Sequence, residues 1–273
     1  MNEFLAERFV ERVTRLVLGI EPVDAQRGSR IAHPVTVAIE GVPYPPTESA
    51  PQDEIGVPDP LGALRRIPRH ASCRHALLYP PAIASPVTLR IYEGARRFVP
   101  RRIRYPLPAD IHTSGPPSRV RRPALFPGAA YDVSPTVTGM RGRVTWKQSA
   151  TNEVPVRWTR VEAAIHGVVV GRAHGDDRGE FLLMLRNEAS GPGDLPSPLV
   201  AQVTVFGPPA PVAVPPNDPF ADLPVEILAG DPDDVSPGEK PLPGYAATAS
   251  STRAVQFELG TLLTDQPKFF FSV

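Results

Sequence analysis

The sequence predicts a mainly β protein with one helix at its N-terminus. Three observations support this prediction. Residues 140–186 combine apolar alternation with turn residues, as an antiparallel β unit requires. The chain has 36 prolines among 273 residues, about 13% against a usual ~5%, and proline fits poorly inside helices and central strands. Apolar residues stand at helical spacing near the N-terminus.

Residues 1–20 are expected to form an amphipathic helix. Asn2 can cap it, and Gly19 followed by Pro22 would end it near Leu18. We expect its apolar stripe to pack on its own domain or to dock into a neighbouring subunit. The stripe residues chosen as candidate contacts are Phe4, Phe9, Val13 and Leu16.

Residues 21–107 are interpreted as a β region rich in proline and arginine. Strands are expected at residues 31–39, 87–92 and 98–107, and residues 41–64 are expected to form a turn-rich loop. Residues 108–130 have the composition of a linker.

Residues 131–206 carry the clearest strand pattern, with apolar alternation at 161–165 and a buried run at 181–185. Between them, Gly175 to Gly179 is expected to form a turn. Gly179 can adopt a positive φ at low cost, and the aspartates can accept hydrogen bonds from nearby backbone N–H groups.

This pattern resembles the carboxypeptidase regulatory-like domain, a transthyretin-like β-sandwich. The resemblance covers roughly a quarter of the chain and implies an antiparallel sandwich with a structural or binding role and no catalytic residues. Trp158 and Thr159 replace a small Gly-Ala pair of the family, so we expect one sandwich edge to be rebuilt. The matching positions are Gly142, Val144, Pro155, Val156, Val161, Gly171, Asp176 or Asp177, Gly179, Phe181 and Leu183.

Residues 207–273 are expected to be an extended region rich in proline and acidic residues, with late strands at 252–259 and 268–273. Phe269, Phe270 and Phe271 would point to both faces of the last strand, so each face needs cover. We therefore expect this end of the chain to be an assembly element that contacts a neighbouring subunit, with packing inside its own domain as the alternative.

The formal net charge is zero, but the charges are separated along the chain. Residues 61–122 contain thirteen arginines but only Glu93 and Asp110 as acids, whereas the region from 207 onward is acidic. We expect the arginine strip to bind an acidic protein surface, such as the acidic region of a neighbouring copy, with nucleic acid and ordinary intradomain pairing as alternatives. The strip residues are Arg96, Arg97, Arg101, Arg102 and Arg104.

Residues that could carry chemistry have simpler interpretations. His70, Cys73 and His75 lack a fourth zinc ligand, and one cysteine cannot form an intrachain disulfide. Residues 217–218 and 231–234 offer oxygen ligands for calcium without EF-hand spacing. His174 beside Asp176 and Asp177 could belong to a hydrolytic set, but the turn explains these aspartates. We expect no enzymatic activity, no cofactor and no resident metal.

Three segments also resemble components of phage-tail-like contractile injection systems: residues 96–103, 126–144 and 171–181. That resemblance implies a non-catalytic homo-oligomeric component at the cap, another tube end or the periphery, in contact with copies of itself or with tube, sheath or baseplate subunits. Charged residues interrupt the apolar positions near the N-terminus, so we expect no signal peptide, and the sequence has no apolar run of the ~18 residues that a membrane span needs. We expect the protein to be in the cytoplasm, alone or as a component of an assembled particle. The alternative is a stand-alone adhesion or ligand-binding β-sandwich module.

Overall fold

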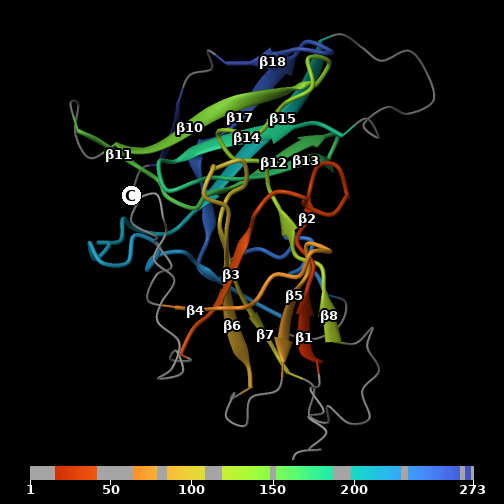
Figure 1. Cartoon of the computed structure of the whole chain (residues 1–273). Helices are drawn as coiled ribbons and strands as arrows, with labels where there is room; N and C mark the ends of the chain where they lie inside the picture. The colour runs from red at the N-terminus through yellow and green to blue at the C-terminus, as the bar shows by residue number, and fades with distance from the viewer. Residues whose placement is uncertain are drawn as a thin grey trace, which may run out of the picture.

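The computed structural model describes residues 16–41, 64–78, 85–107, 119–147, 152–186, 198–228, 233–264 and 268–271. These residues form nineteen strands and almost no helix, which confirms the predicted mainly β fold. Figure 1 shows the strands in a lower and an upper group. Within the described ranges, no helix is long and apolar enough to cross a bilayer.

The lower group contains a five-stranded sheet in the order β16-β7-β6-β3-β4. β3, β6 and β7 pair antiparallel, as hairpin-connected strands commonly do, whereas β16 arrives from much later in the chain and pairs with β7 in parallel. Its strands are β3 (Thr36–Ile39), β4 (Arg65–Arg66), β6 (Val87–Tyr92), β7 (Arg101–Tyr105) and β16 (Val225–Ile227).

Two smaller sheets complete the lower group. One has the order β5-β1-β8 and the other pairs β2 with β9 in parallel. Side chains from all three sheets, among them Ile20, Leu89 and Leu125, share one hydrophobic core. The strands are β1 (Leu16–Ile20), β2 (Val23–Asp24), β5 (His75–Leu78), β8 (Val120–Arg121) and β9 (Ala124–Leu125).

The upper group has two sheets that enclose a second core. In one sheet β10 pairs with β11 and β14 antiparallel and with β18 and β19 in parallel; the other has the order β13-β12-β15-β17. The strands are β10 (Gly139–Lys147), β11 (Glu153–Pro155), β12 (Arg160–Ile165), β13 (Val168–His174), β14 (Glu180–Met184), β15 (Leu199–Gly207), β17 (Ala246–Phe257), β18 (Leu262–Leu263) and β19 (Phe269–Phe271).

Strand β14 belongs to both cores. Phe181 and Leu183 pack into the upper core, whereas Leu182 and Met184 pack into the lower one. Because successive side chains of a strand point to opposite faces, a strand buried on both faces must be apolar at consecutive positions. This explains the uninterrupted apolar run after Glu180.

The phenylalanines of β19 are covered within the chain. Phe269 and Phe271 are almost fully buried in the upper core, and Phe270 is partly exposed on the other face. The guanidinium of Arg253 lies 3.9 Å from the centre of the Phe269 ring. The two buried rings therefore provide intrachain packing rather than the contact with a neighbour that the sequence suggested.

The predicted N-terminal helix does not extend to Leu18, because Leu16, Val17 and Leu18 lie in β1. This strand is paired on both sides, by β5 and by β8, so its backbone groups are satisfied in a sheet. The rest of the predicted helix, with Phe4, Phe9 and Val13, lies outside the described residues.

The structure does not keep two of the predicted divisions of the chain, the linker at 108–130 and the separate extended region after residue 207. Residues 119–130, at the end of the predicted linker, hold β8 and β9. The region after residue 207 supplies β16 to the lower group and β17, β18 and β19 to the upper one. Strands distant in sequence thus join both groups.

Gly179 and Gly244 provide a matched test of the turn at 175–179. Both have positive φ, +72° and +77°. A Cβ on Gly179 would lie 2.4 Å from the carbonyl oxygen of Val144, whereas a Cβ on Gly244 would meet no atom within 4 Å. We expect Gly179→Ala to lower the free energy of unfolding by about 2–4 kcal/mol and Gly244→Ala by about 1 kcal/mol, measured by urea unfolding. Equal losses would contradict the close packing at Gly179.

Candidate functional site

Arg101 of the predicted arginine strip is the most buried charged side chain of β7, with no exposed surface. Its Nε and Nη2 donate to the two carboxylate oxygens of Glu226 at 2.9 and 2.6 Å. Its remaining N–H groups donate to the backbone carbonyls of Ala124, Val235 and Ser236. All five donors of the guanidinium are therefore satisfied, as a buried arginine requires.

Both Arg101 and Glu226 carry their charges. Burial would lower the pKa of Arg101, but the carboxylate of Glu226 outweighs burial and raises that pKa. Burial would raise the pKa of Glu226, but Arg101 and Arg160 hold it below its ordinary value. The expectation that Arg101 binds a partner surface is wrong, because the side chain is enclosed in its own chain.

The other arginines of the strip also have intrachain partners. Arg102 contacts Glu40 at 2.7 Å, Arg96 contacts Asp177 at 3.0 Å, and Arg97 contacts Glu93 at 3.5 Å. Arg104 donates to the hydroxyl of Thr88. Arg96 and Arg97 precede β7 in a turn, and within β7 the half-buried Arg102 and Arg104 lie on the face opposite Arg101.

The acidic segment 207–244 supplies further partners. Asp218 pairs with Arg90 at 2.7 Å, Asp222 with Arg157 at 2.6 Å, and Glu239 with Arg172 at 3.5 Å. Burial would raise the pKa of Asp218, but the hydrogen bond from Arg90 holds it below its ordinary value. These residues pair with arginines of the same chain, whereas the sequence suggested pairing between chains.

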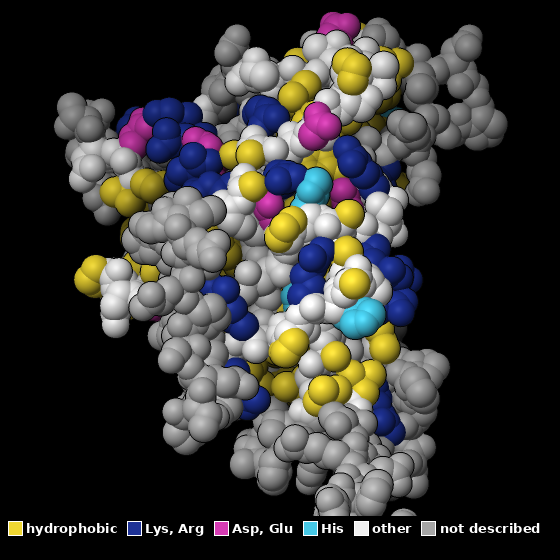
Figure 2. Space-filling model, viewed as in Figure 1, with side chains coloured by type: hydrophobic (Ala, Val, Ile, Leu, Met, Phe, Trp, Pro, Cys, Tyr) yellow, Lys and Arg dark blue, Asp and Glu magenta, His cyan; other side chains and the backbone are white. Residues whose placement is uncertain are grey.

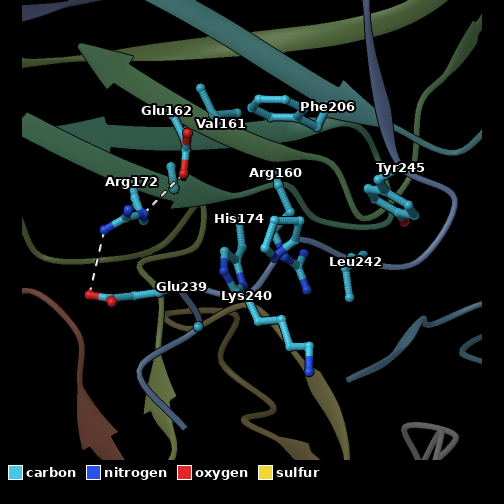
Figure 3. Close-up of a pocket in the computed structure, with 13 residues that line it drawn as sticks. Arg160, Val161, Glu162, Arg172, His174, Phe206, Glu239, Lys240, Leu242 and Tyr245 are labelled. Atoms are coloured by element: carbon cyan, nitrogen blue, oxygen red, sulfur yellow. Dashed lines mark hydrogen bonds and ion pairs between the residues drawn. The ribbon is translucent and has the colours of Figure 1, made fainter. Parts of the chain in front are cut away.

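A pocket lies between residues of β12 and β13, Phe206 of β15 and the segment 238–245 (Figure 3). Its volume is about 60 Å³, enough for a few waters or a group of a few heavy atoms. Apolar and charged side chains both line it. The lining residues include Arg160, Val161, His174, Phe206, Leu242 and Tyr245.

His174 is the buried polar group of this pocket, with 1% of its surface exposed. Its ring stacks on Phe126 with the ring centres 3.7 Å apart. Among the described residues, neither ring nitrogen has a hydrogen-bond partner of normal geometry, although a weaker backbone hydrogen bond with Gly238 acts on the ring. A neutral imidazole has one N–H donor and one acceptor, so the ring can hydrogen-bond a small ligand or water.

Electrostatics keep His174 neutral. Burial lowers its pKa well below the ordinary value, and the positive charges of Arg160 and Arg101 lower it further. The backbone of Gly238 has a smaller effect in the opposite direction. The ring therefore serves as a neutral hydrogen-bonding group in a positive environment.

Arg160 lies beside His174 in Figure 3 and links the pocket to the buried pair. Its Nη2 donates to Glu226 at 3.3 Å, and its Nη1 donates to the backbone carbonyls of Trp158 and Thr159. Burial lowers the pKa of Arg160 more than Glu226 raises it. Two guanidinium groups thus share the single carboxylate of Glu226, and the pocket side of this cluster carries positive charge.

The charged side chains at the rim of the pocket have partners within the same chain. Arg172 donates to Glu162 at 3.0 Å and also contacts Glu239, as the dashed lines of Figure 3 show. Lys240 donates from Nζ to the carbonyl of Ile227 at 3.4 Å. Burial raises the pKa of Tyr245 to about 12, so its hydroxyl remains a donor at neutral pH.

The aspartates next to His174 form the turn that the sequence predicted. Asp176 accepts hydrogen bonds from the backbone N–H groups of Arg178 and Glu180 at 2.8 and 2.9 Å. Asp177 pairs with Arg96. These bonds account for both carboxylates, and the structural interpretation of the turn is confirmed.

The candidate metal ligands are not brought together in the described ranges, where no group of three His, Cys, Asp or Glu side chains could hold a metal ion. His75 is buried, and its Nδ1 lies 3.2 Å from the carbonyl oxygen of Ile67. Cys73 contacts Arg69. Asp233 accepts from the backbone N–H groups of Val235 and Ser236, and Asp231 lies outside the described residues.

Sequence reasoning missed Glu226 and the pocket around His174. A signal for Glu226 existed, since one acid stands between Val225 and Ile227 in an otherwise apolar run, and such an acid is often buried with a partner. The pocket had no comparable signal, because its walls come from three strands and a distant loop.

Comparison of this chain with models of known protein families finds no match, and comparison with curated proteins finds none either.

Glu226→Gln tests the buried pair. The substitution leaves Arg101 as a buried charge without its counter-ion, so we expect a loss of about 3–5 kcal/mol in the free energy of unfolding. Glu153→Gln is the control, because Glu153 pairs with Lys268 at the surface, where such pairs contribute about 0–1 kcal/mol. Urea unfolding measures both. A small loss for Glu226→Gln would contradict the role of the pair.

His174 predicts a pH dependence of stability. The folded state keeps the ring neutral, whereas an unfolded histidine takes up a proton as the pH falls below about 6.5. Stability should therefore fall with pH in that range by up to about 1.4 kcal/mol per pH unit from this residue. His174→Phe should remove this contribution and leave a shallower dependence. Identical pH profiles of the two proteins would refute it.

Proposed function

We propose that this chain is a non-catalytic structural and assembly protein, a component of a phage-tail-like contractile injection particle. It would occupy the cap, another tube end or a peripheral position and act through protein–protein contacts. The resemblance of residues 96–103, 126–144 and 171–181 to such components suggested the role. A cluster of exposed arginines around Glu21 is the surface on which this role can be tested.

Residues 131–206 form, in this proposal, a carboxypeptidase regulatory-like β-sandwich completed by the late strands. The glycines that carry the resemblance have packing roles that support it: a Cβ on Gly142 would lie 2.2 Å from the Phe181 ring, and one on Gly171 would lie 2.7 Å from the Met184 carbonyl oxygen. Trp158, at a position that departs from the family, packs edge-on against Phe220. The N-terminal residues Phe4, Phe9 and Val13 remain candidate helical contacts.

One observation carries the assembly role: three arginines surround a single buried carboxylate at the surface of the lower group. In the register of the sheet, Ile20 is opposite His75 in β5 and beside Arg121 in β8. The next residue, Glu21, consequently meets Arg74 and Arg122, and Arg30 completes the cluster. We call Arg30, Arg74 and Arg122 the arginine patch.

The arginine patch has an excess of positive charge. The three side chains are 39%, 54% and 61% exposed, whereas Glu21 is 6% exposed. Burial would raise the pKa of Glu21, but hydrogen bonds from Arg74 and Arg30 hold it below its ordinary value. Figure 2 shows Lys and Arg side chains with a histidine on the side of the molecule where Figure 1 draws β1, β5 and β8. Guanidinium groups of this kind suit carboxylates of a partner.

The partners in this proposal are acidic surfaces of neighbouring copies or of tube, sheath or baseplate subunits, in the cytoplasm and in the assembled particle. A second candidate function, a ligand-binding β-sandwich module, is favoured by the pocket at His174.

Arg74→Gln with Arg122→Gln tests the role of the patch. Glutamine keeps a donor for Glu21 but removes the charge, so the fold should persist while attachment weakens. In the cells that produce the protein, we expect tagged wild-type chain to sediment with tubular particles and the double variant to be depleted several-fold, more so at high salt.

Arg143→Gln with Lys147→Gln is the matched control, because both residues are exposed on β10 and the change in net charge is the same. Its incorporation should equal that of the wild type. A wild-type chain that sediments only as a free protein would overturn the assembly role. Retention of DNA that is lost in the patch variant while assembly is unaffected would show that the patch binds nucleic acid.

A further inference from the structure

The pocket at His174 combines a buried ring that has no hydrogen-bond partner of normal geometry with positive charge and apolar walls. His174 is buried, and in the described part of the chain its nitrogens have no partner of normal geometry. An unpaired buried polar group is costly, so a native site of this kind calls for a ligand or an ordered water. The ligand must satisfy the ring and suit its surroundings.

The charges at the ring select an anion. The guanidinium groups of Arg160 and Arg101 both act on His174, and they share Glu226 as their carboxylate. An anionic acceptor beside the ring would accept the imidazole N–H and reduce the repulsion within this cluster. A cation at the same place would be repelled by the positive charges of both arginines.

The apolar walls of the pocket favour a ligand whose remaining part is also apolar. Val161, Phe206 and Leu242 line the pocket together with the ring of Tyr245. Binding sites commonly pair such apolar walls with a few polar groups that fix orientation. The volume of about 60 Å³ limits the buried part to a few heavy atoms, and Glu239 and Pro241 at the rim are exposed, so the site can be reached from solvent.

We propose that this pocket binds a carboxylate attached to a short apolar body, with His174 donating to the carboxylate and Arg160 providing the positive field. The carboxylate belongs either to a small free acid or to the carboxyl terminus of a polypeptide. This inference does not depend on the assembly role, and either can fail alone.

The test uses the full chain and sodium butyrate as probe, followed by ¹H–¹⁵N NMR at constant ionic strength. Butyrate should cause saturable shifts at Ala173, Leu242 and the ring nitrogens of His174. Butan-1-ol and n-butylammonium, which share its apolar body, should bind at least about tenfold more weakly, a difference of about 1.4 kcal/mol.

Two histidine-to-phenylalanine variants distinguish butyrate binding in the pocket from an unspecific effect of replacing a buried histidine. His174→Phe should weaken butyrate about tenfold or more without weakening butan-1-ol. His75→Phe is the matched control, because His75 is also buried with an unpaired Nε2 and lies outside the pocket; it should bind butyrate like the wild type. Should His174→Phe fail to fold, Leu242→Phe, which narrows the pocket, replaces it and should also weaken butyrate.

The two sources of the carboxylate are distinguished by the dipeptide Gly-Val and its C-terminal amide. Tighter binding of the dipeptide than of butyrate, lost in the amide, indicates a polypeptide terminus, whereas tighter binding of butyrate indicates a free acid. No saturable shift with butyrate or with the dipeptide would mean that the pocket holds only water. Equal binding of butyrate and butan-1-ol would mean an apolar cavity. Each of these last two results overturns the proposal.

Discussion

The ion pair between Arg101 and Glu226 is the constraint on which much of the structure depends. An arginine with no exposed surface requires a counter-ion and acceptors for five N–H groups. Here they come from β16, from β9 and from the turn at residues 233–236. Satisfying one side chain therefore fixes three distant segments against β7. Burying the pair need not make the protein more stable than an apolar pair would, but breaking it must be costly.

The same constraint explains the course of the acidic segment. Asp218, Asp222, Glu226 and Glu239 bind arginines from different elements of both groups of sheets, so the segment joins the two cores instead of forming a free tail. Because these acids are used within the chain, they are not available as a matching surface for another copy. Among the described residues, accessible positive charge is found around Glu21, where three arginines share one carboxylate. Positive charge also lies beside the pocket at His174.

Local patterns were enough to predict several parts of the fold. Alternation predicted β6 and β12, a continuous apolar run predicted β14, and the need for positive φ predicted the turn at Gly179. Predictions failed where long-range pairing decided the outcome. Leu16 and Val17 belong to a stripe of apolar residues at helical spacing, yet two neighbouring strands hold them in a sheet. The arginine strip was recognised as needing acids, but sequence could not show that Glu226, 125 residues away, would be inside the same chain. The pocket at His174 could not be predicted, because its parts meet only after the sheets form.

A calorimetric melt of the full chain tests most directly whether the buried pair and the acidic segment make one structural unit. If Glu226, β14 and the acidic segment join both cores, the chain should unfold in a single transition whose calorimetric and van't Hoff enthalpies agree. Two separable transitions in the wild-type protein, one for each group of sheets, would contradict the account.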